Sequence, residues 1–192
     1  MTDDNTLRQL RRLSQPFVIL LSIALGLVVL VQVPSIAAML FFFHKDGAWH
    51  AAVSSSEAGI GLSIFRGSDQ VRDVALESLA FGQRAMLALL AGLCAASGGL
   101  VLFHLRQLFV LYSRGVVFAE DNIRHIKRFG LWLVVAAIVV NGSGRAFFIV
   151  TGQHSHGAAN MMMALIFGGM TYVVARVMEL GREAEEERKE FI

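Results

Sequence analysis

The placement of the charged residues constrains this chain more than any other feature. Asp, Glu, Lys and Arg are all absent from three long runs, which lie between Arg12 and Lys45, between Arg84 and Arg106, and between Arg145 and Arg176. Charged residues make up only 17% of the chain and hydrophobic residues 55%, against averages of about 25% and roughly 45–50% in soluble domains. These runs exclude a soluble globule and a disordered chain, and they indicate an integral membrane protein.

Four segments are long and apolar enough to cross a bilayer as helices, at about residues 16–43, 85–103, 129–150 and 158–178. A hydrocarbon core ~30 Å thick is crossed by about 20 apolar residues in a helix, and a helix satisfies its own backbone polar groups inside lipid. Pro34 predicts that the first helix either kinks or ends and restarts. We therefore predict an all-α fold, an integral membrane four-helix bundle in which residues 1–192 form a single domain.

Lys and Arg are unevenly divided between the two sides that four spans define. Twelve of them fall on the side with both termini and loop 104–128, and five fall on the side with loop 44–84 and the end of the third span. Cytoplasmic loops carry an excess of Lys and Arg. We therefore predict that the N-terminus and the C-terminus are both cytoplasmic.

The outer loop at 44–84 is too long for a simple turn. Its serines at 54–56 and its nearby glycines favour irregular chain, whereas residues 69–81 have a helical pattern. That segment is either an amphipathic helix on the membrane surface or the start of the second span.

Histidines and the single cysteine give no firm site. His154 and His156 form an H-x-H pair that, with His44 and His50, could contribute to a zinc or copper site. Such sites need three or four ligands in most cases, and no Cys or carboxylate stands near the pair, so solvated loop histidines are the simpler interpretation. Cys94 is the one thiol and excludes an internal disulfide. We predict no metal and no cofactor.

Two features inside the spans leave alternatives open. Arg145 either reaches the outer headgroups from the end of the third span or faces a polar cavity with Asn141 and Asn160. Small residues at four-residue spacing in the second span allow close helix packing. Gly168 and Gly169 in the fourth span are a candidate partner surface, and the same pattern would also serve a homo-oligomer contact.

The middle loop at 104–128 is predicted to be a helical elbow on the cytoplasmic side. The second span continues as helix to Arg114, where Gly115 is suited to end it. A new helix begins near Glu120, since acidic residues at its start and Lys127 and Arg128 at its end suit the helix dipole. The elbow lies either against lipid headgroups or against a cytosolic partner.

The motif in this loop resembles a known family. The run Leu105-Arg-x-Leu-Phe-x-Leu-Tyr-x-Arg-Gly115-x-Val-Phe118, followed by Glu120, Asn122 and Ile126-x-x-Phe-Gly130, is similar to an uncharacterised family of bacterial four-span membrane proteins catalogued as a domain of unknown function. The Glu-rich tail at 179–192 resembles that family as well. The resemblance implies the bacterial cytoplasmic (inner) membrane and no known enzyme activity. It also implies a partner, since members are often encoded beside a small helix-turn-helix DNA-binding protein.

The expected function is that of a non-enzymatic membrane protein that regulates or anchors a cytosolic, DNA-binding protein, without binding nucleic acid itself. The sequence has no HExxH, G-x-S-x-G or Walker motif, so no catalytic residue is predicted. The partner-binding candidates lie in the loop and the tail, and they are Phe118, Ile126, Lys127, Arg128, Glu183, Glu185, Glu186 and Glu187. The alternative is a small transporter or channel component, or an accessory subunit of a membrane complex, with Arg145, Asn141 and Asn160 lining its polar cavity.

Overall fold

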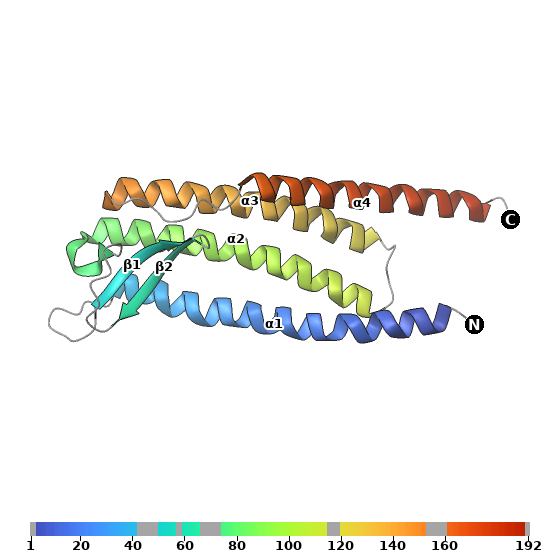
Figure 1. Cartoon of the computed structure of the whole chain (residues 1–192), viewed down its shortest axis with the longest axis horizontal. Helices are drawn as coiled ribbons and strands as arrows, with labels where there is room; N and C mark the ends of the chain where they lie inside the picture. The colour runs from blue at the N-terminus through green and yellow to red at the C-terminus, as the bar shows by residue number, and fades with distance from the viewer. Residues whose placement is uncertain are drawn as a thin grey trace. The chain divides into compact units, whose positions relative to one another are not determined.

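The structure is a computed structural model that describes residues 3–41, 50–56, 59–65, 74–114, 120–152 and 161–190. It contains four long helices (Figure 1), which are α1 (Asp3–Phe41), α2 (Phe81–Ser113), α3 (Glu120–Thr151) and α4 (Met161–Glu190). Each has a segment long and apolar enough to cross a membrane. The predicted helical fold with four spans is confirmed.

The helices are longer and more continuous than the sequence predicted. Helix α1 does not end at Pro34, although this residue has no N–H to donate to the preceding turn. Helix α3 starts at Glu120, as predicted, and then runs without interruption through Asn141 and Arg145. The second half of the predicted elbow and the third span are therefore one helix.

Hydroxyl and amide side chains inside these helices bond to their own backbone. Ser35 Oγ donates to the Val31 carbonyl at 2.7 Å, and Asn141 Nδ2 donates to the Ala137 carbonyl at 2.8 Å. Such bonds to the preceding turn satisfy polar groups that lipid would leave unsatisfied. This is why a polar cluster such as 141–145 does not break α3.

The loop between α1 and α2 contains a small antiparallel sheet. Strands β1 (His50–Ser56), β2 (Gly59–Phe65) and β3 (Val74–Ala75) are arranged in the order β2-β1-β3. Val53 of β1 pairs with Leu62 and with Val74. The prediction of irregular chain is therefore wrong at residues 54–56, Gly59 and Gly61, and Gly67 lies outside the described residues. The predicted helix at 69–81 is also wrong over 74–80, where β3 and a 3₁₀ turn at Leu76–Ser78 precede α2; residues 69–73 lie outside the described residues.

Contacts divide the chain into two compact units. Unit 1 comprises Met1–Gly26, Gly99–Val134 and Met162–Ile192, and unit 2 comprises Leu27–Gly98 and Val135–Met161. Helices α1, α2 and α3 each contribute residues to both.

Among the described residues, unit 2 has the larger apolar core. Its buried residues come from three helices and from the sheet region, and they are Met39, Val53, Ile60, Val74, Leu76, Leu79, Leu87, Ala88, Ala91 and Phe147. The core of unit 1 is smaller and joins α2, α3 and α4 through Leu108, Ile123, Ile126 and Ala175. The sheet residues in unit 2 explain why the loop folds, since pairing and burial together override weak local preferences.

Candidate functional site

Helices α3 and α4 approach closely in unit 1 at a pair of glycines. A Cβ atom added to Gly168 would lie 2.6 Å from Val134 Cγ2 and 3.1 Å from the Gly130 carbonyl oxygen. A Cβ atom added to Gly130 would lie 3.0 Å from the Gly168 carbonyl oxygen and 3.2 Å from Thr171 Cβ. Only glycine permits this approach, and small residues serve the same purpose at other membrane helix contacts.

A groove of about 360 Å³ runs beside this crossing and is named here the α3/α4 groove. Its lining is apolar apart from two cationic side chains and a tyrosine, and it consists of Lys127, Arg128, Gly130, Leu131, Val134, Gly168 and Tyr172. Arg128, Leu131 and Tyr172 are exposed.

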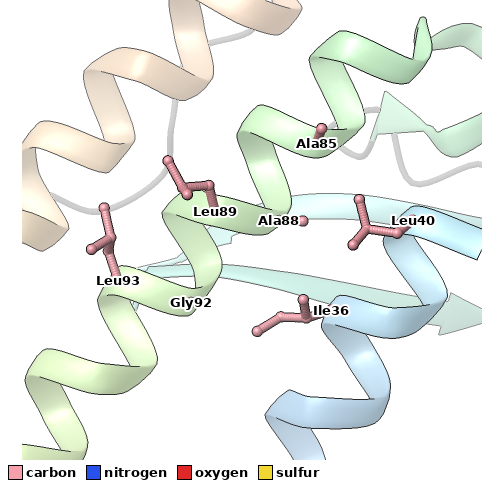
Figure 2. A pocket seen from close by; sticks show the side chains of 7 residues that line it. All are labelled: Ile36, Leu40, Ala85, Ala88, Leu89, Gly92 and Leu93. Atoms are coloured by element: carbon pink, nitrogen blue, oxygen red, sulfur yellow. The ribbon is translucent and has the colours of Figure 1, made fainter.

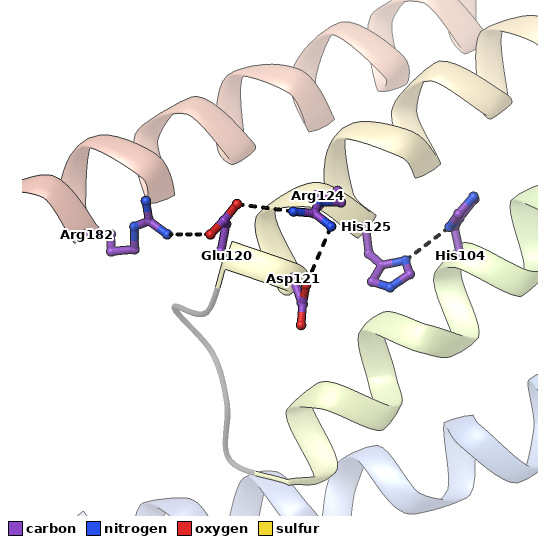
Figure 3. Close-up of polar contacts among 6 residues, drawn as sticks. All are labelled: His104, Glu120, Asp121, Arg124, His125 and Arg182. Carbon is purple, nitrogen blue, oxygen red and sulfur yellow. Dashed lines mark hydrogen bonds and ion pairs between the residues drawn. The ribbon is translucent and has the colours of Figure 1, made fainter.

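Ion pairs tie the polar part of α4 to α3. Lys127 Nζ lies 2.9 Å from Glu179 Oε2, and the same carboxylate oxygen lies 2.8 Å from Arg176 Nη1. Arg182 of α4 lies 3.8 Å from Glu120 at the start of α3 (Figure 3). These pairs fix which face of α4 meets α3.

The first turn of α3 contains two acidic side chains that pair with an arginine of the same helix. Arg124 Nη2 lies 3.2 Å from Glu120 Oε1, and Arg124 Nη1 lies 4.0 Å from Asp121 Oδ1 (Figure 3). Acidic side chains in the first turn of a helix are stabilised by the positive end of the helix dipole. Glu120 thus contacts cations from α3 and from α4.

Two histidines of unit 1 face each other from α2 and α3 (Figure 3). The Nδ1 atoms of His104 and His125 are 3.1 Å apart, and His104 is buried. One imidazole must donate while the other accepts, so the pair holds this bond only when at least one ring is neutral. Sequence reasoning missed this pair because the two histidines are 21 residues apart and belong to no motif.

Helix α1 joins unit 1 through one polar and one aromatic contact with α2. Arg106 Nε donates to Ser22 Oγ at 2.7 Å. The rings of Phe17 and Phe109 stack with their centroids 5.0 Å apart. Arg106 therefore has a hydroxyl partner within the apolar part of α1.

Unit 2 has a groove of its own between α1 and α2, named here the α1/α2 groove. Its lining side chains are labelled in Figure 2, and they are Ile36, Leu40, Ala85, Ala88, Leu89, Gly92 and Leu93. The groove is open and has a volume of about 450 Å³. Every one of these residues is apolar, so the lining offers no charge and no side-chain hydrogen bond to a ligand.

Polar contacts between the helices of unit 2 are few in the described residues. Cys94 Sγ donates to Ser143 Oγ at 3.3 Å. Gln83 Nε2 donates to the Val150 carbonyl at 3.0 Å. The buried thiol of α2 therefore has an acceptor on α3, and the Ser143 hydroxyl donates in turn to the Val140 carbonyl of its own helix at 2.8 Å.

The predicted partner-binding residues have different surroundings. Ile126 is buried in the core of unit 1, and Lys127 is paired with Glu179. Arg128 and Glu183 are exposed. Phe118 lies outside the described residues, and Glu185, Glu186 and Glu187 belong to α4 with side chains that are not described.

The described residues do not test the predicted polar cavity, which stays a prediction. Arg145 is exposed, and Asn141 is half-buried with its amide on its own helix. Neither residue lines the α1/α2 groove or the α3/α4 groove. Asn160 lies outside the described residues.

The structure also bears on the predicted partner surface at Gly168 and on metal binding. Gly168 packs against α3, not against the small residues of α2, whose Gly92 lies near Ile36 of α1. Within the described ranges, no three His, Cys, Asp or Glu side chains come close enough to hold a metal ion. His154 and His156 lie outside those ranges.

The motif of the middle loop largely coincides with the packing of unit 1. Leu108 and Ile126 are buried there, Leu105, Tyr112 and Phe129 pack against them, and Gly130 forms the crossing with α4. Asn122 is fully buried. The motif therefore specifies how α2, α3 and α4 pack.

This helical architecture defines a multi-pass membrane protein with four candidate spans. The profile of the family described as "Protein of unknown function (DUF2975)" matches residues 48–190, and the chain belongs to this family. No curated protein matches the chain, and no solved structure matches it.

Proposed function

We propose that this protein is a non-enzymatic protein of the bacterial cytoplasmic membrane that binds a basic cytosolic protein through the acidic part of α4. A small helix-turn-helix DNA-binding regulator is the partner that we favour. The observation that carries the proposal is the continuity of α4, which runs as one helix from its apolar part to Glu190.

The ion pairs with α3 support this role. Glu179 is paired with Lys127 and Arg176, and Arg182 is paired with Glu120, so the base of the acidic segment is held in place. Glu183 follows these pairs and is exposed. A rigid acidic helix attracts a basic surface and steers its approach.

The same surroundings narrow the predicted contact surface. Because Ile126 is buried and Lys127 is paired, these two residues near the start of α3 offer little to a soluble partner. The acidic segment of α4 carries six Glu against three Lys or Arg over residues 179–192. A DNA-binding surface held there would be kept away from DNA phosphates, since both compete for the same cations.

The test is recovery of the partner from the native host after crosslinking and mild-detergent purification. Neutralising Glu183, Glu185, Glu186 and Glu187 to Gln should reduce recovery of a basic protein at least fivefold. The control neutralises four carboxylates of the loop between α1 and α2, at Asp46, Glu57, Asp69 and Asp73. Equal recovery with both quadruple variants, or recovery of other membrane subunits alone, would contradict the proposal.

The proposed orientation has its own test, for which the single Cys94 is convenient. In a Cys94→Ser background, Glu183→Cys should be protected from a membrane-impermeant maleimide in intact cells, and Glu57→Cys should react. The opposite pattern would place the acidic segment outside the cell and exclude a cytosolic partner.

A further inference from the structure

We propose that the α3/α4 groove binds one anionic phospholipid, with its phosphate beside Arg128 and an acyl chain over Leu131 and Val134. This inference is independent of the proposed regulatory function, since it concerns the groove beside the glycine crossing and not the acidic segment of α4 that follows Glu179.

The apolar part of the groove suits a hydrocarbon chain. Gly130 and Gly168 belong to its lining at the close crossing of the two helices, and Leu131 and Val134 provide its apolar side chains. Its volume of about 360 Å³ lies within the range of roughly 300–1,000 Å³ found for small-molecule sites.

The polar groups lie at one end of the groove. On α3, Lys127 and Arg128 are the last charged residues before a charge-free stretch at 129–144. On α4, Gly168 lies in a charge-free stretch that continues past Tyr172 to Arg176. The contacts Gly130–Gly168 and Lys127–Glu179 show that the two helices are antiparallel, so both reach their charged parts at the same end.

This division matches the shape of a phospholipid, whose headgroup and chains occupy different depths. Tyr172 is exposed, and tyrosines are enriched at the headgroup level of membrane proteins. Basic pockets between membrane helices bind anionic headgroups in other proteins. A soluble phosphate would gain nothing from the apolar lining.

The local charge favours an anionic headgroup. Lys127, Arg128 and Arg176 provide three cations at this end, and Glu179 is the one carboxylate that pairs with any of them in the described residues. Arg128 is exposed and has no carboxylate within 4.0 Å in that part of the chain. A lipid phosphate would supply its counterion.

The test is native mass spectrometry of the full chain, solubilised in detergent and titrated with phosphatidylglycerol or phosphatidylcholine of identical acyl chains. We expect the wild type to retain one phosphatidylglycerol in preference to phosphatidylcholine. Arg128→Gln should lower that preference about fivefold, the effect of one cation near a membrane surface. Retention of the preference in Arg128→Gln would overturn the proposal.

The control is Arg114→Gln, which removes the same charge from an exposed position at the end of α2, outside the groove. It should leave the preference unchanged, and an equal loss would assign the effect to general surface charge and overturn the site. Both variants should keep the helical circular dichroism of the wild type, since both side chains are exposed.

Two further experiments distinguish binding of the acyl chain from binding of the phosphate. Leu131→Trp fills the apolar part of the groove and should reduce retention of phosphatidylglycerol at least threefold, and unchanged retention would overturn the position of the chain. Inorganic phosphate should not displace the lipid. Displacement by phosphate alone would identify a phosphate site and overturn the lipid proposal.

Discussion

Units 1 and 2 share helices α1, α2 and α3, and unit 1 also contains α4, but the two units are held together by different chemistry. Unit 2 buries a core of large apolar side chains to which the sheet region contributes Val53, Ile60 and Val74. Unit 1 has a small core and relies on a glycine crossing, a histidine pair and ion pairs between α3 and α4.

The difference shows where the hydrophobic effect can act in a membrane protein. Lipid tails are as apolar as leucine, so burial among lipid-exposed helices gains little, and close packing or polar contacts must hold them together. A loop segment that would otherwise meet water gains from burying its apolar side chains. Unit 2 includes such a segment between α1 and α2, and unit 1 has close packing and polar contacts in its place.

A substitution in the core of unit 2 is expected to have the largest effect on the free energy of unfolding. Phe147→Ala removes a ring that is 1% exposed and should lower the free energy of unfolding by about 3–5 kcal/mol. The neighbouring Phe148 is 43% exposed and gives the matched control, Phe148→Ala. Reversible unfolding in mixed detergent measures both, and equal losses would contradict the distinction between core and surface.

A substitution at the glycine crossing of unit 1 is expected to have the second-largest effect on the free energy of unfolding. Gly168→Ala forces Val134 or the Gly130 backbone to move and should cost about 1–3 kcal/mol of unfolding free energy. Gly169→Ala has open space around its Cβ and should be neutral or stabilising by up to about 1 kcal/mol, because alanine is the better helix former. A neutral Gly168→Ala would refute the close crossing.

The histidine pair should make unit 1 sensitive to pH. Burial is the main cause that lowers the pKa of His104 and the pKa of His125, and the nearby Arg128 lowers both further. The hydrogen bond between the two rings needs one neutral ring, so it is kept at neutral pH and is lost as the pH falls and both rings become charged. Wild type should lose about 0.5–1.5 kcal/mol more than His125→Asn between pH 7.5 and pH 5.5.

The other four histidines are present in both proteins, so their effects cancel in that difference. An identical pH dependence of unfolding in the wild type and in His125→Asn would show that the two rings do not share a proton.

The ion pairs are expected to contribute least to the free energy of unfolding. A double-mutant cycle with Lys127→Gln and Glu179→Gln should give a coupling of about 0.5–1 kcal/mol, since the Glu179 side chain is only 25% exposed. The corresponding cycle for Glu120 and Arg124, which are both well exposed, should give about 0.3–0.5 kcal/mol. A larger coupling in the exposed pair would reverse this order.

Much of the helical fold follows from the sequence because lipid imposes a simple rule. The long apolar segments identify all four helices, and the acidic pair at 120–121 identifies the start of α3. The sheet was missed although Ile60, Leu62 and Ile64 alternate with small residues, a pattern typical of strands. Glycines and serines mask that signal, and pairing with β1 decides the outcome.

The site was harder to predict because its residues meet only through tertiary packing. Lys127 was a predicted partner-binding residue, whereas Glu179 was only the first residue of the acidic tail, and their pairing depends on the antiparallel crossing of α3 and α4. The contact between His104 and His125 likewise depends on the packing of α2 against α3. Spacing along the chain specifies neither.

The composition of the two units also sets the order in which they become complete during synthesis. Unit 2 contains no residue beyond Met161, whereas unit 1 needs α4. Since parts of a chain that are synthesised first generally fold first, the sheet and its apolar core can form while α4 is still in the ribosome. The contacts of Gly130 with Gly168 and of Lys127 with Glu179 can form only after α4 has been synthesised. The α3/α4 groove is therefore assembled after the core of unit 2.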